Sequence, residues 1–362
     1  MTRQLEAVER ASGAQMVPFG ESVLPARFGD GQQEYAAVRQ RCGLLDAGFR
    51  AVLRLTGGDR VSFLQGMLSN DVARLRDGDG IAAALLTQQG KVVSDLRVYA
   101  LRDEMWLDVP AGRAAAVRAA LAHFIIADDV EFVDDPAWVP LVAVEGPHAD
   151  RVLVGVTGTA LAGTAPWAHQ EVHFDGVPLR AVAVGHAGMP GYLLIGDPAV
   201  AERLWAHCRA AGAEPVGMDA LDVLRVEAGI PWHGCDMDED TLIGEVGLAD
   251  HVSYKKGCYL GQEVVERLAA RGQVQRKLVG LLCAGPTIPP AETTLRHEGK
   301  DVGWTTSAVW SPARASVVAL AYVRRERWDP GTTLDLVIDG QTTTAQVTTL
   351  PFYGAKDSGT GC

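Results

Sequence analysis

The chain has 362 residues, of which 48% are apolar and 22% are charged, and its formal net charge is −12. A single hydrophobic core stops growing at about 250–300 residues, so this length predicts two or three domains. The apolar content excludes extensive disorder. The acidic balance argues against a nucleic-acid partner, because neutralising phosphates requires an excess of Lys and Arg. No run reaches the roughly 18 consecutive apolar residues that a membrane span needs.

The six cysteines are scattered along the chain without a C-x-x-C pair. They are Cys42, Cys208, Cys235, Cys258, Cys283 and Cys362. This spacing predicts neither a zinc site nor a cluster-binding run nor a disulfide framework. The N-terminal residues lack the apolar core of a secretory signal. We therefore expect no bound metal and a cytoplasmic location.

The first part of the chain begins with a segment that we expect to be irregular, since residues 1 to about 30 contain several prolines and glycines. A helix follows and leads to a turn at Leu45 to Gly48. The next residues predict a β-α-β-β-(β)-α-β unit. Its expected elements are strands at Val52 to Leu55, Ile81 to Thr87, Val92 to Leu101, Met105 to Val109 and Val130 to Val133, and helices after Asp59 and from Gly112 to Phe124.

The section that follows repeats this plan faintly, with strands and helices in the same order from Pro140 to Ala228. Two such copies predict a pseudo-symmetric core with a cleft between them. Past Arg276, short apolar stretches alternate with Gly, Pro and Asp turns, which is typical of a small closed barrel. The predicted fold class is therefore α+β, with two pseudo-repeated split β-α-β (ferredoxin-like) modules and a C-terminal β-barrel.

The stretch from Ser253 to Glu263 concentrates unusual chemistry. Cys258 follows Lys255 and Lys256 and precedes a helical pattern. The positive end of a helix and the two lysines would favour thiolate over thiol. A free cysteine is also commonly just a small buried apolar residue, so the residues alone leave both interpretations open.

Residues 256–263, Lys-Gly-Cys-Tyr-Leu-Gly-Gln-Glu, resemble the K-G-C-Y-x-G-Q-E signature of the YgfZ family. These are folate-binding proteins similar to the T-protein (aminomethyltransferase) of the glycine cleavage system. Three further stretches look like motifs of this group: Leu68–Val72 resembles L-x-N-D-V, Gly90–Tyr99 a glycine-led hairpin ending in D-L-x-V-Y, and Leu224–Pro231 L-R-x-E-x-G-x-P. The resemblance implies tetrahydrofolate, or a one-carbon derivative of it, as cofactor. It also implies a role in the assembly or repair of iron–sulfur enzymes that depends on the motif cysteine.

The family architecture implies three domains in a cloverleaf around a folate-binding funnel, with a discontinuous first domain. The expected boundaries are residues 1–48 and 137–250 for the first domain, 49–136 for the second, 251–275 for the cysteine-motif loop and helix, 276–354 for the barrel, and 355–362 for a mobile tail.

Asp95 falls where T-proteins similar to this chain carry the catalytic aspartate. A carboxylate inside an apolar hairpin that faces a cleft would bind the pterin edge or accept a proton from a folate nitrogen. The alternation around Asp95 also allows a strand aspartate on the solvent face. T-proteins usually have two adjacent aspartates here, whereas this chain has Ser94 before Asp95.

Arg225 is expected to clamp a folate amide or carboxylate, or else to form a structural ion pair with Glu227 or a neighbouring helix. Met189 stands where T-proteins carry the glutamate of G-E-D-G, which counts against aminomethyl transfer. The resemblance implies a catalytic pair and a cofactor-binding set. The catalytic residues are Cys258 and Asp95, and the cofactor-binding residues are Asn70, Asp95, Tyr192, Arg225 and Lys256.

These features favour a folate-binding accessory protein for iron–sulfur enzymes, with Cys258 as its functional thiol and iron–sulfur client or assembly proteins as its partners. The alternative is a folate-dependent aminomethyltransferase or demethylase that passes a one-carbon unit to tetrahydrofolate. Asp95 supports that alternative, while Ser94 and Met189 count against it. A third hypothesis is a folate-binding module without chemistry.

Overall fold

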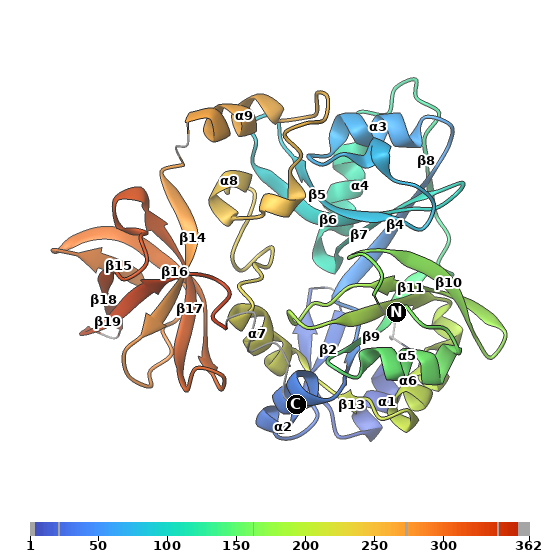
Figure 1. The fold of residues 1–362 in the computed structure, drawn as a ribbon, viewed down its shortest axis with the longest axis horizontal. Helices are drawn as coiled ribbons and strands as arrows, with labels where there is room; N and C mark the ends of the chain where they lie inside the picture. The colour runs from blue at the N-terminus through green and yellow to red at the C-terminus, as the bar shows by residue number, and fades with distance from the viewer. Residues whose placement is uncertain (1–3, 21, 162, 272–273, 339, 354–362) are drawn as a thin grey trace. The chain divides into compact units, whose positions relative to one another are not determined.

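A computed structural model describes residues 4–20, 22–161, 163–271, 274–338 and 340–353. The chain divides into two compact units. Unit 1 consists of Met1–Leu86, Val93–Leu221 and Asp250–Leu260, and unit 2 of Thr87–Val92, Asp222–Ala249 and Gly261–Cys362. Unit 1 holds two open sheets, and unit 2 holds a closed barrel (Figure 1).

The N-terminal segment is regular, so the prediction of an irregular lead-in is wrong. It contains helix α1 (Glu6–Ala11) and a two-stranded ribbon of β1 (Gln15–Phe19) and β2 (Ser22–Arg27). Pro18 pairs with Val23, and Pro25 with Met16. A ribbon of two strands leaves one edge of each strand outside the ladder, so it accommodates prolines that a central strand would exclude.

The first sheet of unit 1 has six strands in the order β10-β11-β12-β9-β3-β13. Its strands are β3 (Gly43–Asp46), β9 (Val139–Glu145), β10 (His169–Phe174), β11 (Val177–Ala183), β12 (Gly191–Gly196) and β13 (Glu214–Pro215), and its helices are α2 (Gly31–Gln40), α5 (Ala149–Thr157) and α6 (Ala201–Ala210). Apolar side chains of α5 and α6 cover one face of the sheet (Figure 1). The turn predicted at Leu45 to Gly48 is wrong in its first residues, because β3 is a buried strand paired with β9.

The second sheet of unit 1 has five strands in the order β5-β6-β7-β4-β8. Its elements are β4 (Arg50–Thr56), α3 (Arg60–Met67), β5 (Gly80–Leu86), β6 (Val92–Ala100), β7 (Met105–Pro110), α4 (Ala114–Ala122) and β8 (Glu131–Val133), with short 3-10 turns at Val72–Arg74 and Ala111–Arg113. This is the predicted order of strands and helices. Apolar residues of α3 and α4 cover one face.

The alternation of side chains along β6 decides where the site lies. Leu96, Val98 and Ala100 belong to the core beneath α3 and α4. Successive side chains of a strand point to opposite faces, so Asp95 and Arg97 point to the face without helices. We call this the inner face of the second sheet.

Unit 2 contains a closed barrel in the order β14-β17-β16-β15-β18-β19. Its strands are β14 (Arg276–Cys283), β15 (Thr294–His297), β16 (Lys300–Ser311), β17 (Ser316–Arg324), β18 (Thr333–Ile338) and β19 (Gln341–Thr348). The remaining helices are α7 (Met218–Glu227), α8 (Ile243–Val246) and α9 (Gln262–Arg271). Helix α7 begins in unit 1 and ends in unit 2. The remaining 3-10 turns lie at Pro198–Val200, Ala249–His251 and Arg325–Arg327. The sequence missed β15, because four residues beside a Glu298-Gly299 turn give little periodicity.

The predicted fold class is confirmed: two similar α+β modules are followed by a small closed barrel. The domain boundaries stay predictions. The predicted mobile tail, residues 355–362, lies outside the described residues. Within the ranges given above, no helix combines the length and the hydropathy required to cross a bilayer.

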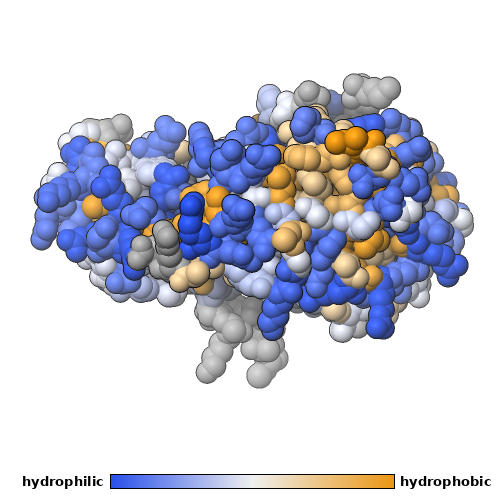
Figure 2. Space-filling view, turned by 90° about the horizontal axis from the view of Figure 1, so that it is seen from above, coloured by the Kyte–Doolittle hydropathy of each residue, from blue (hydrophilic) through white to orange (hydrophobic). Residues whose placement is uncertain are grey.

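Several large apolar side chains are exposed on the surface. They are Val17, Ile126, Val154, Tyr254, Ile288 and Trp310. Figure 2 shows one face of the molecule, with apolar side chains gathered in the right-hand part of the view among hydrophilic ones. The exposed residues come from separate elements of both units, and no contact shows what would cover them.

Candidate functional site

The candidate site begins at Asp95, on the inner face of β6. Its Oδ1 atom is buried and has no hydrogen-bond partner among the described residues. A buried carboxylate oxygen without a donor costs about 1–3 kcal/mol or more, so such atoms call for an explanation. The atom is placed to accept a hydrogen bond from a ligand.

His251 adds a second polar atom of this kind. Its Nδ1 is buried and also has no hydrogen-bond partner within the described ranges. Burial lowers the pKa of His251, and the charge of Asp95 partly opposes that shift. His251 is therefore neutral near pH 7, and its ring interacts electrostatically with Asp95.

The loop that carries His251 is anchored to the end of α3 by Ser69 and Asn70. Ser69 Oγ donates to the carbonyl of His251 at 2.6 Å. Asn70 Nδ2 donates to the carbonyls of Ala82 at 2.7 Å and Asp250 at 2.8 Å. Both amide protons of Asn70 are thus used, so this side chain orders the loop. Its predicted cofactor contact would have to go through Oδ1, which already accepts from Asp71.

Lys256 holds the far end of the same loop. Its ammonium donates to the carbonyls of Gln65 and Leu68, both at 2.6 Å, and of Asn70 at 2.9 Å. Gln65 lies in the last turn of α3, and Leu68 and Asn70 follow the helix. Backbone acceptors at a helix C-terminus lack intrahelical partners. Burial lowers the pKa of Lys256 to about 8, and the charge of Asp71 opposes the shift. A cofactor would have to displace one of the three carbonyls to contact this ammonium.

Cys258 is exposed. The interpretation of this cysteine as one more buried apolar residue is therefore wrong. Its neighbour Lys256 directs its ammonium to α3, as described above. The chemical role of the thiol stays a prediction.

Tyr192 and Met189 make their contacts with the first sheet of unit 1 and its helices. Tyr192 is packed in the core beneath α5, where its hydroxyl donates to Asp150. Burial raises the pKa of Tyr192 above its ordinary value, and the contact with Asp150 adds to the rise. Met189 is buried, and its sulfur accepts a weak hydrogen bond from Arg39 at 3.6 Å. The predicted folate contact of Tyr192 would require this packing to open.

Beside Asp95, the inner face carries a buried cluster of charges centred on Asp108. Its carboxylate accepts from Arg50 Nε at 2.7 Å, from Arg97 Nη1 at 3.0 Å and from the Tyr99 hydroxyl at 2.7 Å. Although burial raises the pKa of Asp108, Arg50 and Arg97 lower it to about 2. Asp108 is therefore ionised at every physiological pH.

Arg225 lies in unit 2 and is almost fully buried, with 2% of its side chain exposed. It donates to Asp222 at 2.7 Å, to Ser307 at 2.7 Å and to Asp236. An ion pair is thus present, although it is made with Asp222 and Asp236 and not with the expected Glu227. Asp95 and Arg225 fall in different units, so the funnel that they would share stays a prediction, as does the folate clamp.

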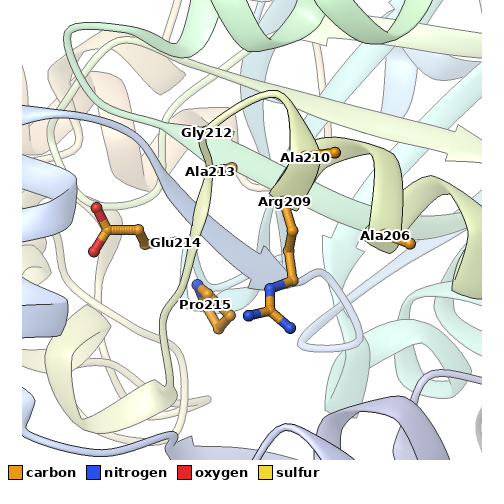
Figure 3. Close-up of a pocket in the computed structure, with 7 residues that line it drawn as sticks. All are labelled: Ala206, Arg209, Ala210, Gly212, Ala213, Glu214 and Pro215. Carbon is orange, nitrogen blue, oxygen red and sulfur yellow. The ribbon is translucent and has the colours of Figure 1, made fainter.

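Two hollows lie apart from the residues described above for unit 1. A cavity of about 920 Å³ in unit 2 is lined by Arg225, Asp236 and the aromatic pair Trp304 and Tyr322. A cavity of about 590 Å³ in unit 1 lies at the end of α6 (Figure 3). Arg209 and Glu214 line this second cavity, but Glu214 is paired with Arg41 at 2.9 Å, and the side chain of Glu214 points away from Arg209 (Figure 3). This second cavity therefore offers few free polar groups to a ligand.

Sequence reasoning missed three residues of the unit 1 site: Arg97, His186 and His251. Arg97 was within reach, because it lies two positions after Asp95 on the same strand and therefore on the same face. His186 and His251 belong to no spacing pattern. Their contacts with β6 depend on the packing of elements far apart in the sequence.

Comparisons with known proteins bear on the fold and the family of the chain. Residues 5–256 match the GCVT N-terminal domain, and residues 276–354 match the glycine cleavage T-protein C-terminal barrel domain. An aminomethyltransferase of Synechococcus sp. (strain RCC307) is 34% identical over 346 residues, which cover 95% of this chain and 96% of the relative. An aminomethyltransferase of Streptomyces avermitilis is 32% identical, over 96% of each chain.

The crystal structure of the glycine cleavage system aminomethyltransferase T from Bartonella henselae superposes with a TM-score of 0.89, at 25% identity, and the match covers 98% of each chain. The finer YgfZ resemblance finds no support in these matches, since the relatives carry the name aminomethyltransferase. The chain belongs to the family of the glycine cleavage T-protein.

Proposed function

We propose that this protein is a folate-dependent one-carbon transferase, which passes a one-carbon unit from an aminomethyl or related amine donor to tetrahydrofolate. Aminomethyltransferases of this family use tetrahydrofolate as the one-carbon acceptor. The observation that carries the proposal is the buried, unpartnered Oδ1 of Asp95 on the inner face of β6. This was the alternative that the sequence left open, and it now takes precedence over the accessory role.

The residues around Asp95 fit a ligand with a polar ring edge. Asp95 offers an acceptor that lacks a donor, and His251 offers a buried ring nitrogen that lacks a partner. Arg97 uses only Nη1 in its hydrogen bonds, so its Nε and Nη2 protons have no protein partner among the described residues. Folate presents both N–H donors and carbonyl acceptors, and this set supplies complements to both.

Each group has a separate task in this proposal. Asp95 accepts a hydrogen bond or a proton at Oδ1, and its position next to Arg97 keeps a cation beside the charge. His251, being neutral near pH 7, can accept or donate one proton at Nδ1. Tetrahydrofolate would supply the nucleophilic nitrogen that receives the one-carbon unit. The cytoplasmic location expected from the sequence belongs to this proposal.

Initial-rate measurements with the purified protein test the proposal. Transfer of a methylene carbon from an aminomethyl donor releases ammonia, so methylene-tetrahydrofolate and ammonia should form in equal amounts. We expect both to appear with tetrahydrofolate present and neither without it. A protein that binds no tetrahydrofolate and forms neither product contradicts the proposal.

A second candidate function is the accessory role for iron–sulfur enzymes. It is favoured by the Lys256–Glu263 motif, by the exposed thiol of Cys258 and by Met189 at the place of the pterin-binding glutamate. Cells that carry Cys258→Ala should then lose iron–sulfur enzyme activity, whereas transfer to tetrahydrofolate in vitro should persist. If Cys258→Ala leaves those enzymes fully active, the accessory role is excluded.

A further inference from the structure

His186 lies at the inner face of the second sheet and is held from one side by Glu145. His186 is 3% exposed and Glu145 is fully buried. The Glu145 carboxylate accepts from the backbone N–H groups of His186 and Ala187, both at 2.8 Å, and lies 2.7 Å from Nδ1 of His186. A carboxylate that receives these N–H groups acts as an acceptor, so Nδ1 of His186 carries the proton.

This tautomer leaves a lone pair on Nε2 of His186. Nη1 of Arg97 lies 3.0 Å from that atom and donates to it. Burial lowers the pKa of His186, and the charge of Arg97 lowers it further. The imidazole is therefore a neutral acceptor whose orientation is set by Glu145.

The two protons of Arg97 Nη1 are thus both assigned, one to His186 Nε2 and one to Asp108 Oδ2. Because a guanidinium is planar and rigid, two bonds from one nitrogen fix the direction of its other donors. Those donors, on Nε and Nη2, have no hydrogen-bond partner in the described part of the chain. The side chain keeps 17% of its surface exposed, so they remain accessible.

Asp108 alone would hold Arg97 less firmly. The same carboxylate already receives Arg50 and the Tyr99 hydroxyl, which compete for its lone pairs. His186 supplies the second, independent acceptor for Nη1. Several charged or titratable groups interact electrostatically with Arg97, His186 and His251. They are Arg50, Asp95, Tyr99, Asp108, Glu145 and Asp250.

We propose that His186 is a positioning residue for Asp95: by accepting a hydrogen bond from Arg97, it fixes the Arg97 guanidinium as the countercharge of the Asp95 carboxylate. The proposal rests on the proposed function, because it assigns Asp95 its role in transfer. His186 itself touches neither reactant. Its effect passes through Arg97, whose charge acts on Asp95.

Two substitutions separate positioning from simple packing. Leucine at this position (His186→Leu) fills a similar volume and removes the acceptor. Glutamine (His186→Gln) can donate to Glu145 and accept from Arg97 through one amide, so it keeps both bonds without a titrating ring. His169→Gln is the matched control, since His169 is an equally buried histidine whose Nδ1 contacts Arg180 at 3.1 Å instead of Arg97.

The readout is the tetrahydrofolate-dependent rate, separated into kcat and the KM for the aminomethyl donor. Without the acceptor at position 186, the Arg97 guanidinium is no longer held in one orientation beside Asp95, so kcat should fall about tenfold in His186→Leu while the KM for the donor changes little. His186→Gln keeps both hydrogen bonds and should keep the wild-type kcat, and so should His169→Gln.

An unchanged kcat in His186→Leu overturns the inference, as does an equal loss of kcat in His169→Gln. Nitrogen-15 NMR of histidine-labelled wild-type protein gives an independent test, which needs no variant to fold. We expect a neutral His186 with its proton on Nδ1 at pH 7.5, and a proton on Nε2 or a doubly protonated ring overturns the network. A wild-type protein without folate binding or transfer defeats the proposed function, and the positioning role with it.

Discussion

Two carboxylates, one in each unit, differ in how completely their oxygens are hydrogen-bonded. In unit 2, Asp236 accepts from Arg225, from the hydroxyls of Thr306 and Ser307 at 2.6 and 2.7 Å, and from the backbone of Trp232 at 3.0 Å. In unit 1, Oδ1 of Asp95 has no donor within the described residues.

The difference distinguishes a structural ion pair from a binding site. Breaking a buried ion pair is costly, because removal of one partner leaves the other charge buried and uncompensated. A carboxylate whose partners are all internal also has no bonding capacity left for a ligand. A buried carboxylate oxygen without a partner is a cost to the fold that a ligand can relieve. Asp236 therefore belongs to the framework of unit 2, and Asp95 to a place where something binds.

The largest expected effect is on catalysis and follows from Asp95→Asn. The amide keeps the shape but removes the charge and the basicity, so the rate of transfer to tetrahydrofolate should fall about 10³-fold. The free energy of unfolding should hold or rise, because no hydrogen bond to Oδ1 is lost. Rates and urea denaturation check both parts. Asp103→Asn, an exposed aspartate in the turn after β6, is the control; a rate for Asp95→Asn within threefold of the wild type would remove Asp95 from the mechanism.

The next effect is on stability and follows from Asp236→Asn. The variant leaves Arg225 buried with one charged partner fewer, which should lower the free energy of unfolding by about 3 kcal/mol. Asp134→Asn breaks the ion pair of Asp134 with Arg118. The Asp134 side chain is 72% exposed, so this change should leave the free energy of unfolding nearly unchanged. Chemical denaturation measures both. Equal losses would mean that burial does not set the value of these pairs.

His169 provides a prediction on pH within unit 1. Burial, and then the charge of Arg180, lower the pKa of His169 to about 4. Between about pH 6.5 and pH 4 the unfolded chain binds a proton that the folded protein does not, so this group makes stability fall as the pH falls. His169→Gln should reduce that acid loss by about 2 kcal/mol, as measured by denaturation at pH 7 and pH 4.5. An unchanged pH dependence would show that His169 takes up its proton in the folded state.

The smallest effect is expected at His251. Its Nδ1 makes no hydrogen bond with the described residues, so His251→Leu should leave the free energy of unfolding nearly unchanged. Loss of a ligand contact should slow transfer about tenfold. His123→Leu, at an exposed histidine after α4, is the control for the measurement. A rate equal to that of the wild type would place His251 outside the site.

Much of the fold followed from local patterns in the sequence. The alternation in the first part of β6, the glycine turn at Gly90 and the separated apolar stretches of the barrel are each recognisable within a few residues. The ribbon of β1 and β2 did not, because its prolines read as breaks although a two-stranded edge tolerates them.

The site was only partly predictable for the same reason. Asp95 was singled out from a motif, and so was Cys258, whose role stays a prediction. The contact of Arg97 with His186 joins positions 89 apart and depends on how the inner face of the second sheet is covered. The orientation of the Tyr192 side chain was not predicted, because the sequence of the strand does not show which of its faces packs beneath α5. Lys256 was predicted to bind the cofactor because its motif does not reveal its partners. Its ammonium contacts three carbonyls at the end of α3, and no short motif encodes such a contact.

The central claim is that Asp95 marks the folate site, and a crystal structure with bound tetrahydrofolate tests it most directly. The account predicts a nitrogen of the ligand within about 3 Å of Asp95 Oδ1, with Arg97 or His251 on the same ring edge. A ligand lodged instead in the cavity lined by Trp304 and Tyr322, with Asp95 Oδ1 still lacking a donor, would contradict it.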